Sequence, residues 1–184
     1  MLSLVTAMQR QTASSAASLA EFNKSFGDRI QALARSTDLL VDGGWSSVDL
    51  AQLVRAQLDP FLHLQGKGVD VAGPTVALGP QALQLIGMAL HELATNSTKY
   101  GVMSGGGGDI RCHWSHTEQG GLRFQWIETG ITFDPSAKKA SGFGSKVLSV
   151  LAPAMVDGSA DTVTSEDALT WTVTIPAAHL GKVT

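Results

Sequence analysis

The amino-acid sequence predicts an α+β protein, in which an amino-terminal helical hairpin precedes a sandwich of one sheet covered on one face by helices. Apolar residues recur at helical spacing through the first 42 residues. The Gly43-Gly44 pair interrupts this pattern and marks the expected boundary between two regions, residues 1–43 and 44–184. Beyond the boundary, segments with the alternation of strands flank one long helical segment.

The first region has the pattern of two helices. Residues 1–42 contain no proline and one glycine, Gly27, and the small polar run at 13–18 is the expected turn. Two helices bury little surface alone, so we expect the hairpin to pair with a second copy as half of a four-helix bundle. The alternative is that it folds back onto the rest of its own chain. The apolar stripe of its second helix comprises Leu19, Phe22, Phe26, Ile30, Leu33 and Leu40.

The second region mixes helices and strands. A helix is expected over roughly residues 48–58, where Pro60 ends it. Gly79-Pro80 opens the long helix, because proline suits a first helical turn, and Gly101 can end it. The other expected elements are two short strands within 67–78, strands over 109–116 and 122–128, a short helix over 146–152, and a closing hairpin over 163–165 and 169–175.

The long helix carries the most informative stretch, at residues 91–100. At about 100° per residue, Glu92, Asn96 and Lys99 fall within an arc of roughly 60° on one face. A carboxylate and an amide oxygen one turn apart can share a hard cation such as Mg²⁺, and a lysine beyond them can neutralise phosphate oxygens. The alternative is an ordinary solvated polar face. The opposite, apolar face comprises Leu83, Ile86, Leu90, Leu93 and Ala94.

Two further segments suit a phosphate-bearing ligand. Gly142-Phe143-Gly144-Ser145 precedes the expected short helix, and glycines there let a backbone approach an anion closely. An ordinary junction between loop and helix is the alternative, and neither the P-loop nor the Rossmann pattern is present. Glu128 ends a strand, where its carboxylate can accept hydrogen bonds from an exocyclic amine such as that of adenine.

The composition of the chain indicates which kinds of partner and which cellular compartment to expect. A net charge of −3 argues against a nucleic-acid-binding surface. A single cysteine, Cys112, excludes an intrachain disulfide and fits a reducing compartment. The sequence contains no apolar run long enough to span a bilayer, and its start lacks the basic region of a signal peptide. We therefore expect a cytoplasmic protein without a membrane segment.

The segment His-Glu-Leu-Ala-Thr-Asn-Ser-Thr-Lys-Tyr-Gly at 91–101 closely resembles the N box of the HWE class of sensor histidine kinases. These kinases belong with gyrase, Hsp90 and MutL to the Bergerat-fold, or GHKL, ATPases. The class is named for a histidine in this box and for a Trp-x-Glu motif, which His91 and Trp126-Ile127-Glu128 match. Residues 142–145 resemble its second glycine box, and residues 21–40 resemble the second helix of its dimerisation domain.

The resemblance covers nearly the whole chain and implies roles for particular residues. Glu92 would be catalytic, polarising the attacking group or positioning a water near the γ-phosphate. Asn96 would coordinate Mg²⁺, Lys99 would contact phosphates, and Glu128 would recognise adenine, which Gly130 would let approach. Tyr100 would cover the nucleotide, or else pack under the sheet. The remaining implied nucleotide contacts are Gly142, Phe143, Gly144, Ser145 and Thr170, with a lid at about 131–141 that carries Lys138 and Lys139.

The resemblance implies a protein histidine kinase with ATP and Mg²⁺ as cofactors. Residues 1–43 would form a homodimer, and residues 44–184 would be the catalytic ATP-binding domain. The γ-phosphate would pass to a histidine and then to the aspartate of a response-regulator receiver domain, under an upstream sensor domain that this chain does not contain. The alternatives are a non-enzymatic phosphotransfer or scaffold protein with a vestigial nucleotide site, and an ATPase of the gyrase or Hsp90 type.

One expected part of a histidine kinase is missing from this sequence. The family's phosphoacceptor segment would lie just ahead of Met1, and none of the five histidines lies on the first expected helix. We favour a fragment cut after the acceptor over a natural loss. The isolated chain is then expected to bind ATP without phosphorylating itself.

Overall fold

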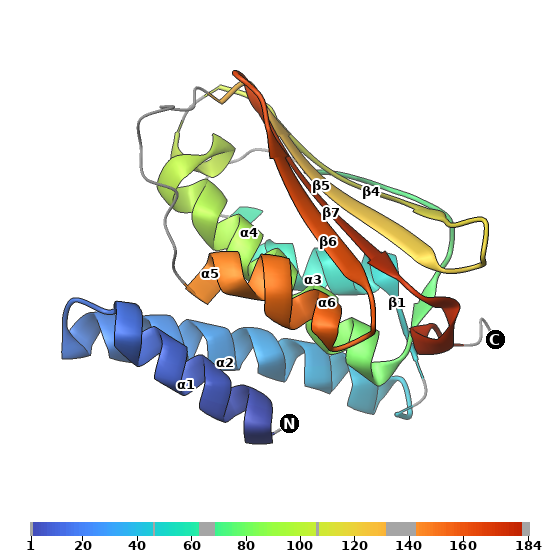
Figure 1. Ribbon diagram of the computed structural model, residues 1–184, viewed down its shortest axis with the longest axis horizontal. Helices are drawn as coiled ribbons and strands as arrows, with labels where there is room; N and C mark the ends of the chain where they lie inside the picture. The colour runs from blue at the N-terminus through green and yellow to red at the C-terminus, as the bar shows by residue number, and fades with distance from the viewer. Residues whose placement is uncertain (1, 46, 63–68, 106, 132–142, 182–184) are drawn as a thin grey trace.

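The computed structural model describes residues 2–45, 47–62, 69–105, 107–131 and 143–181. Figure 1 shows three layers: a helical hairpin, a layer of helices, and a twisted sheet. The helical layer covers one face of the sheet, which confirms the predicted α+β sandwich. Among the described residues, no helix is both long and apolar enough to cross a membrane.

The hairpin consists of α1 (Leu2–Ser15) and α2 (Leu19–Asp42), as the sequence predicts. A reciprocal cap starts α2: the Ser18 hydroxyl accepts a hydrogen bond from the Glu21 amide, and the Glu21 carboxylate accepts one from the Ala17 amide. Gly43 caps the other end of α2, with its amide donating to the Leu39 carbonyl. The predicted boundary glycine therefore ends the hairpin.

The main sheet has five strands in the order β2-β4-β5-β7-β6. β2 runs parallel to β4, and the other neighbours are antiparallel. β1 and β3 pair separately, so the two strands expected within residues 67–78 belong to different sheets. The bounds are β1 Val48–Asp49, β2 Val69–Ala72, β3 Ala77–Leu78, β4 Asp109–His116, β5 Leu122–Thr129, β6 Ser159–Thr164 and β7 Ala168–Ile175.

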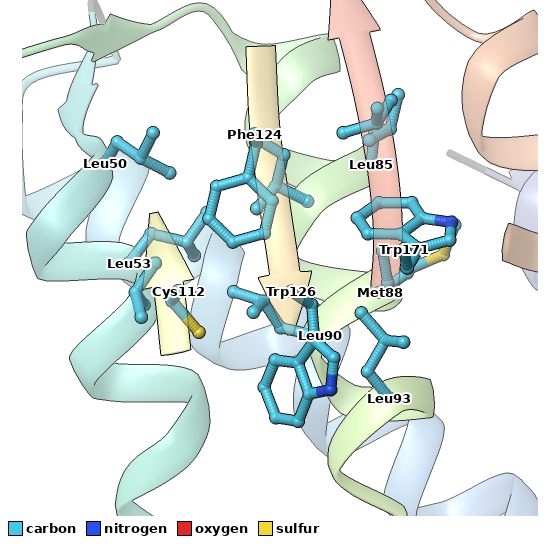
Figure 2. Close-up of a cluster of buried hydrophobic side chains, with 14 of the residues drawn as sticks. Leu50, Leu53, Leu85, Met88, Leu90, Leu93, Cys112, Phe124, Trp126 and Trp171 are labelled. Atoms are coloured by element: carbon cyan, nitrogen blue, oxygen red, sulfur yellow. The ribbon is translucent and has the colours of Figure 1, made fainter. Parts of the chain in front are cut away.

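The main core lies between this sheet and the helices α3 (Leu50–Leu62) and α4 (Pro80–Tyr100). Figure 2 shows aromatic rings of β5 and β7 facing leucines of both helices. Phe124 packs edge-on to Trp171, with ring centroids 6.3 Å apart. Along β5, buried side chains alternate with exposed or half-exposed ones, as expected for a sheet with one covered face.

Two helical predictions differ in detail from the structure. α3 continues through Pro60 to residue 62, so this proline does not end the helix as predicted. The helix expected at 146–152 is present within a longer helical segment, in which a π-helical turn at Val147–Leu151 joins α5 (Phe143–Lys146) to α6 (Ala152–Ala154). The Trp171 indole donates to the Leu148 carbonyl in this turn, which ties it to the sheet.

α4 begins and ends where the sequence predicts, between Gly79 and Gly101. Its surroundings differ from the prediction, because the hairpin covers the side of α4 that faces away from the sheet. A Cβ at Gly87 would clash with the Ser36 hydroxyl, so α2 and α4 approach each other closely at that point. In this single chain the hairpin folds back onto its own helical layer, which was the alternative arrangement. The four-helix bundle with a second copy stays a prediction.

Candidate active site

Glu92 lies on the face of α4 that the hairpin covers and is only 3% exposed. Its Oε1 accepts a 2.6 Å hydrogen bond from Nε of Arg29 on α2, and its Oε2 accepts a 3.2 Å bond from Nη2. Arg29 also donates from Nη1 to the hydroxyl of Thr12 on α1, at 3.1 Å. The catalytic candidate therefore sits at a junction of three helices and is held in a buried ion pair.

Gly144 brings the second glycine segment against the same carboxylate. A Cβ added at Gly144 would lie 2.8 Å from Oε2 of Glu92 and 3.6 Å from Nδ2 of Asn96. The backbone there approaches α4 so closely that a side chain would force Glu92 to shift. Two segments 50 residues apart, both singled out in the sequence, thus meet at one place.

The predicted polar face of α4 becomes progressively more exposed toward its carboxyl end. Glu92 is buried, Asn96 is half-buried and Lys99 is exposed. The alternative of an ordinary solvated polar face is wrong for Glu92, because the hairpin covers it. Tyr100 is 72% exposed, which excludes packing of its ring under the sheet.

Glu128 is buried at the end of β5 and accepts three hydrogen bonds. Its Oε2 accepts from the Ser97 hydroxyl at 2.9 Å and from the Val102 amide at 3.0 Å, and its Oε1 accepts from the Trp126 indole at 2.9 Å. Glu128 is 3% exposed, so it is not an ordinary solvated acid at the end of a strand. The two named residues of the Trp-x-Glu motif are direct partners, which the sequence did not reveal.

His91 neighbours Glu92 and is also buried under the hairpin, where its ring packs against that of Phe61. Its Nδ1 has no hydrogen-bond partner among the described residues. Burial, followed by the positive charges of Arg35 and Arg29, lowers the pKa of His91 from 6.5 to about 4. The imidazole is therefore neutral at pH 7 in this arrangement.

The structure places some of the other candidate residues and does not describe the rest. Gly130 adopts the positive φ of 77° and lies against Gly108. Thr170 does not join the site: its neighbour Trp171 points into the core, so strand alternation places Thr170 on the outer face of the sheet, away from α4. Ser145 is exposed beside Gly144. Gly142, the Phe143 side chain, and the lid from residue 132 with Lys138 and Lys139 lie outside what the structure describes.

Known proteins with similar sequences include histidine kinases. Residues 1–75 match the family model described as HWE histidine kinase. A blue-light-activated histidine kinase of Brucella anthropi is 28% identical over 152 residues, covering 80% of this chain and 30% of that protein. A protein of the same name from Rhizobium johnstonii is 29% identical over 151 residues, covering 82% and 43%. This chain thus spans less than half the length of these relatives.

Solved structures support the same fold. The histidine kinase domain of the Erythrobacter litoralis EL346 blue-light activated histidine kinase superposes with a TM-score of 0.68 at 16% identity, covering 96% of this chain and 83% of that one. Full-length ShkA in complex with AMPPNP superposes with a TM-score of 0.54 at 17% identity, covering 96% and 42%. At these identities the likeness concerns the fold alone, and the fold is that of histidine kinase catalytic domains.

Proposed function

Since this chain is related to the HWE histidine kinases, we propose that it binds Mg-ATP beside the carboxyl end of α4 and transfers the γ-phosphate to a histidine. The phosphoryl group would then pass to an aspartate of a response-regulator receiver domain. In this proposal, residues 1–43 supply the dimerisation hairpin and residues 44–184 supply the nucleotide-binding domain. The acceptor histidine would come from another polypeptide or from a longer form of the chain.

The close approach of Gly144 to Glu92 and Asn96 is the observation that carries the proposal. Phosphoryl transfer depends mainly on alignment and charge neutralisation, so a phosphate site needs backbone amides next to polar side chains. A glycine segment pressed against a carboxylate and a carboxamide provides such a cradle. A plain junction between loop and helix would not require contact with those two side chains.

The residues near Gly144 suit a magnesium ion held together with a nucleotide. Mg²⁺ prefers oxygen ligands and keeps few protein ligands when phosphates complete its shell. The half-buried Asn96 carboxamide would hold it, and the described residues contain no cluster of three acidic, histidine or cysteine side chains that would form a cage instead. When bound, the ion would neutralise charge on the phosphate oxygens.

The remaining residues would orient the nucleotide. Lys99, exposed about one turn beyond Asn96, would contact phosphate oxygens. Glu128 Oε1 accepts one hydrogen bond, from Trp126, and keeps acceptor capacity for an exocyclic amine of adenine. ShkA, which has the same fold, was solved with the ATP analogue AMPPNP, so this fold accommodates such a ligand.

Binding of a fluorescent ATP analogue, titrated with and without Mg²⁺, tests the proposal. We expect Asn96→Ala to weaken Mg-dependent binding at least tenfold, a loss of about 1.4 kcal/mol, because the variant lacks the metal-binding amide oxygen. Asn23→Ala makes the same change at an exposed position of α2 and should bind like the parent chain. Equal affinities of the Asn96 variant and the parent would remove the metal role, and no binding by the parent would favour the scaffold alternative.

A further inference from the structure

Arg29 connects the hairpin to the catalytic candidate through a contact that the proposed function does not use. Its guanidinium spans from Thr12 on α1 to Glu92 on α4, and its side chain is 13% exposed. Thr12 is itself buried, and its hydroxyl donates to the Met8 carbonyl at 2.6 Å. This hydrogen bond fixes the hydroxyl that accepts from Arg29. A surface ion pair would not have this support.

The enclosure of Glu92 excludes other ligands. Each of its carboxylate oxygens accepts a hydrogen bond from Arg29, and the Gly144 backbone lies against Oε2. A small cavity lies at this junction, and its lining includes Met8 and Met88. Its volume is only about 10 Å³. That volume is about the size of one water molecule, so neither a phosphate nor an imidazole ring can enter it.

A second contact fastens the hairpin further along α4. The amide nitrogen of Gln57 on α3 donates to the Ser36 hydroxyl and to the Ala32 carbonyl, both at 2.9 Å. Ser36 in turn packs against Gly87, where no side chain would fit. Other contacts also attach the hairpin, among them the hydrogen bond from Lys146 to Gln11 and the packing of Met8 and Leu40 in the core, and the Arg29 contact is the one that involves Glu92.

We infer that Arg29 is an autoinhibitory latch: it holds the hairpin on α4 and occupies the carboxylate that the proposed phosphotransfer requires. Glu92 becomes available to position a nucleophile or a water only when the hairpin moves away and Arg29 leaves it. The inference rests on the proposed function for the role of Glu92, whereas the holding of the hairpin stands on the contacts alone. A change in the hairpin's position would then regulate the site.

Amide hydrogen exchange on the full chain tests whether Arg29 holds the hairpin. Replacement of Arg29 leaves a buried carboxylate without its partner, which favours undocking. We expect Arg29→Gln to accelerate exchange of residues 29–40 by about tenfold or more, while β4 and β5 exchange as in the parent chain. Lys24→Gln removes the same charge at an exposed position of α2 and should change neither region. Unchanged exchange in residues 29–40, or equal acceleration in the sheet, would overturn the latch.

Slow hydrolysis of Mg-ATP to ADP and phosphate tests inhibition, because water then serves as the acceptor. Water attacks the γ-phosphorus and ADP leaves, so no other reactant is needed. We expect Arg29→Gln to raise the hydrolysis rate at saturating Mg-ATP about fivefold or more. The double variant Arg29→Gln with Glu92→Gln should lose that increase. A rate that falls in Arg29→Gln while nucleotide affinity is kept would show that Arg29 assists the reaction, which overturns inhibition.

The two measurements separate failure of this inference from failure of the proposed function. If neither the parent nor Arg29→Gln binds the ATP analogue, the proposed function fails and the inhibitory part fails with it. The exchange result still decides whether Arg29 holds the hairpin. If nucleotide binds but exchange and hydrolysis are the same in Arg29→Gln and Lys24→Gln, the proposed function survives and the latch does not.

Discussion

Glu128 joins three parts of the chain through one buried carboxylate. Its partners Ser97, Val102 and Trp126 come from α4, from the 3₁₀ turn at Val102–Ser104 and from β5. A buried carboxylate is costly unless donors surround it, and here three donors do. The arrangement gives a physical reason for the tryptophan two residues before the glutamate: both side chains point to the covered face, where the indole donates to Oε1. The motif thus stabilises the end of α4 whether or not adenine binds there.

His91 makes the stability of the chain depend on pH. Its pKa is lowered to about 4 in the folded chain, mainly by burial, then by Arg35, Arg29 and Lys99, with Asp28 acting in the opposite direction. The unfolded chain binds the proton more tightly, with a pKa near 6.5. The stabilisation is therefore complete above about pH 6.5 and is lost as the pH falls from there to about 4. The shift corresponds to about 3 kcal/mol at most.

Urea unfolding measured between pH 4 and pH 7.5 checks this expectation. The free energy of unfolding of the parent chain should fall more steeply below pH 6.5 than that of His91→Gln, which has no imidazole to protonate. His116→Gln, at the exposed end of β4, serves as the control and should follow the parent chain. Parallel curves for His91→Gln and the parent would show that His91 does not make this contribution.

At the scale of the elements, two helical glycines have opposite surroundings. A Cβ at Gly87 of α4 would meet the Ser36 hydroxyl, which Gln57 also holds, whereas a Cβ at Gly27 of α2 would meet nothing within 4 Å. Alanine normally stabilises a helix interior relative to glycine by roughly 0.5–1 kcal/mol. We expect Gly27→Ala to show that gain, and Gly87→Ala to lose about 1–2 kcal/mol because α2 must shift.

Thermal unfolding followed by circular dichroism measures both changes. For a chain of this length, about 1 kcal/mol corresponds to roughly 2–4 °C in the midpoint. The two substitutions should therefore move the midpoint in opposite directions. A stabilising Gly87→Ala would mean that the close packing of α2 on α4 does not hold in solution.

The sequence predicts an element well when the residues that determine it lie within or next to that element. α4 was placed to the residue because Pro80 and Gly101 are end signals that act within one turn. β4 and β5 were placed within a residue because their alternation reflects one covered face. The π-helical turn could not be predicted, since it depends on an indole from β7, more than 20 residues away in sequence. The partners of Glu92 and Glu128 were also missed, because they come from distant segments.

At the scale of the whole molecule, the hairpin and the sandwich share one helical layer. α3 and α4 have apolar residues toward the sheet; α4 also presents Gly87 and Glu92 to α2, and α3 presents Gln57. The periodicity of α4 alone predicts one buried face and one solvent-exposed face. Nearly the whole circumference is buried except near the carboxyl end, and this burial on both sides leaves Asn96 and Lys99 as the accessible part of the candidate site.

This shared layer predicts that the chain unfolds in one cooperative transition. In the described part of the chain the hairpin packs against the helical layer formed by α3, α4 and α5, so it should lose its helices when that layer melts. Helix content can be followed by circular dichroism at 222 nm. The sheet can be followed by fluorescence of Trp114, Trp126 and Trp171 in the variant Trp45→Phe, because Trp45 is 62% exposed and would report on the boundary instead.

The two probes should give midpoints that agree within about 2 °C, and Trp45→Phe should keep the circular dichroism midpoint of the parent chain. Loss of the Arg29 contact is a smaller event than this unfolding, because it loosens the hairpin locally while the rest of the chain stays folded. A circular dichroism transition well below the fluorescence transition would mean that the hairpin melts by itself. The sandwich would then be the cooperative unit, and the hairpin an appendage held by local contacts.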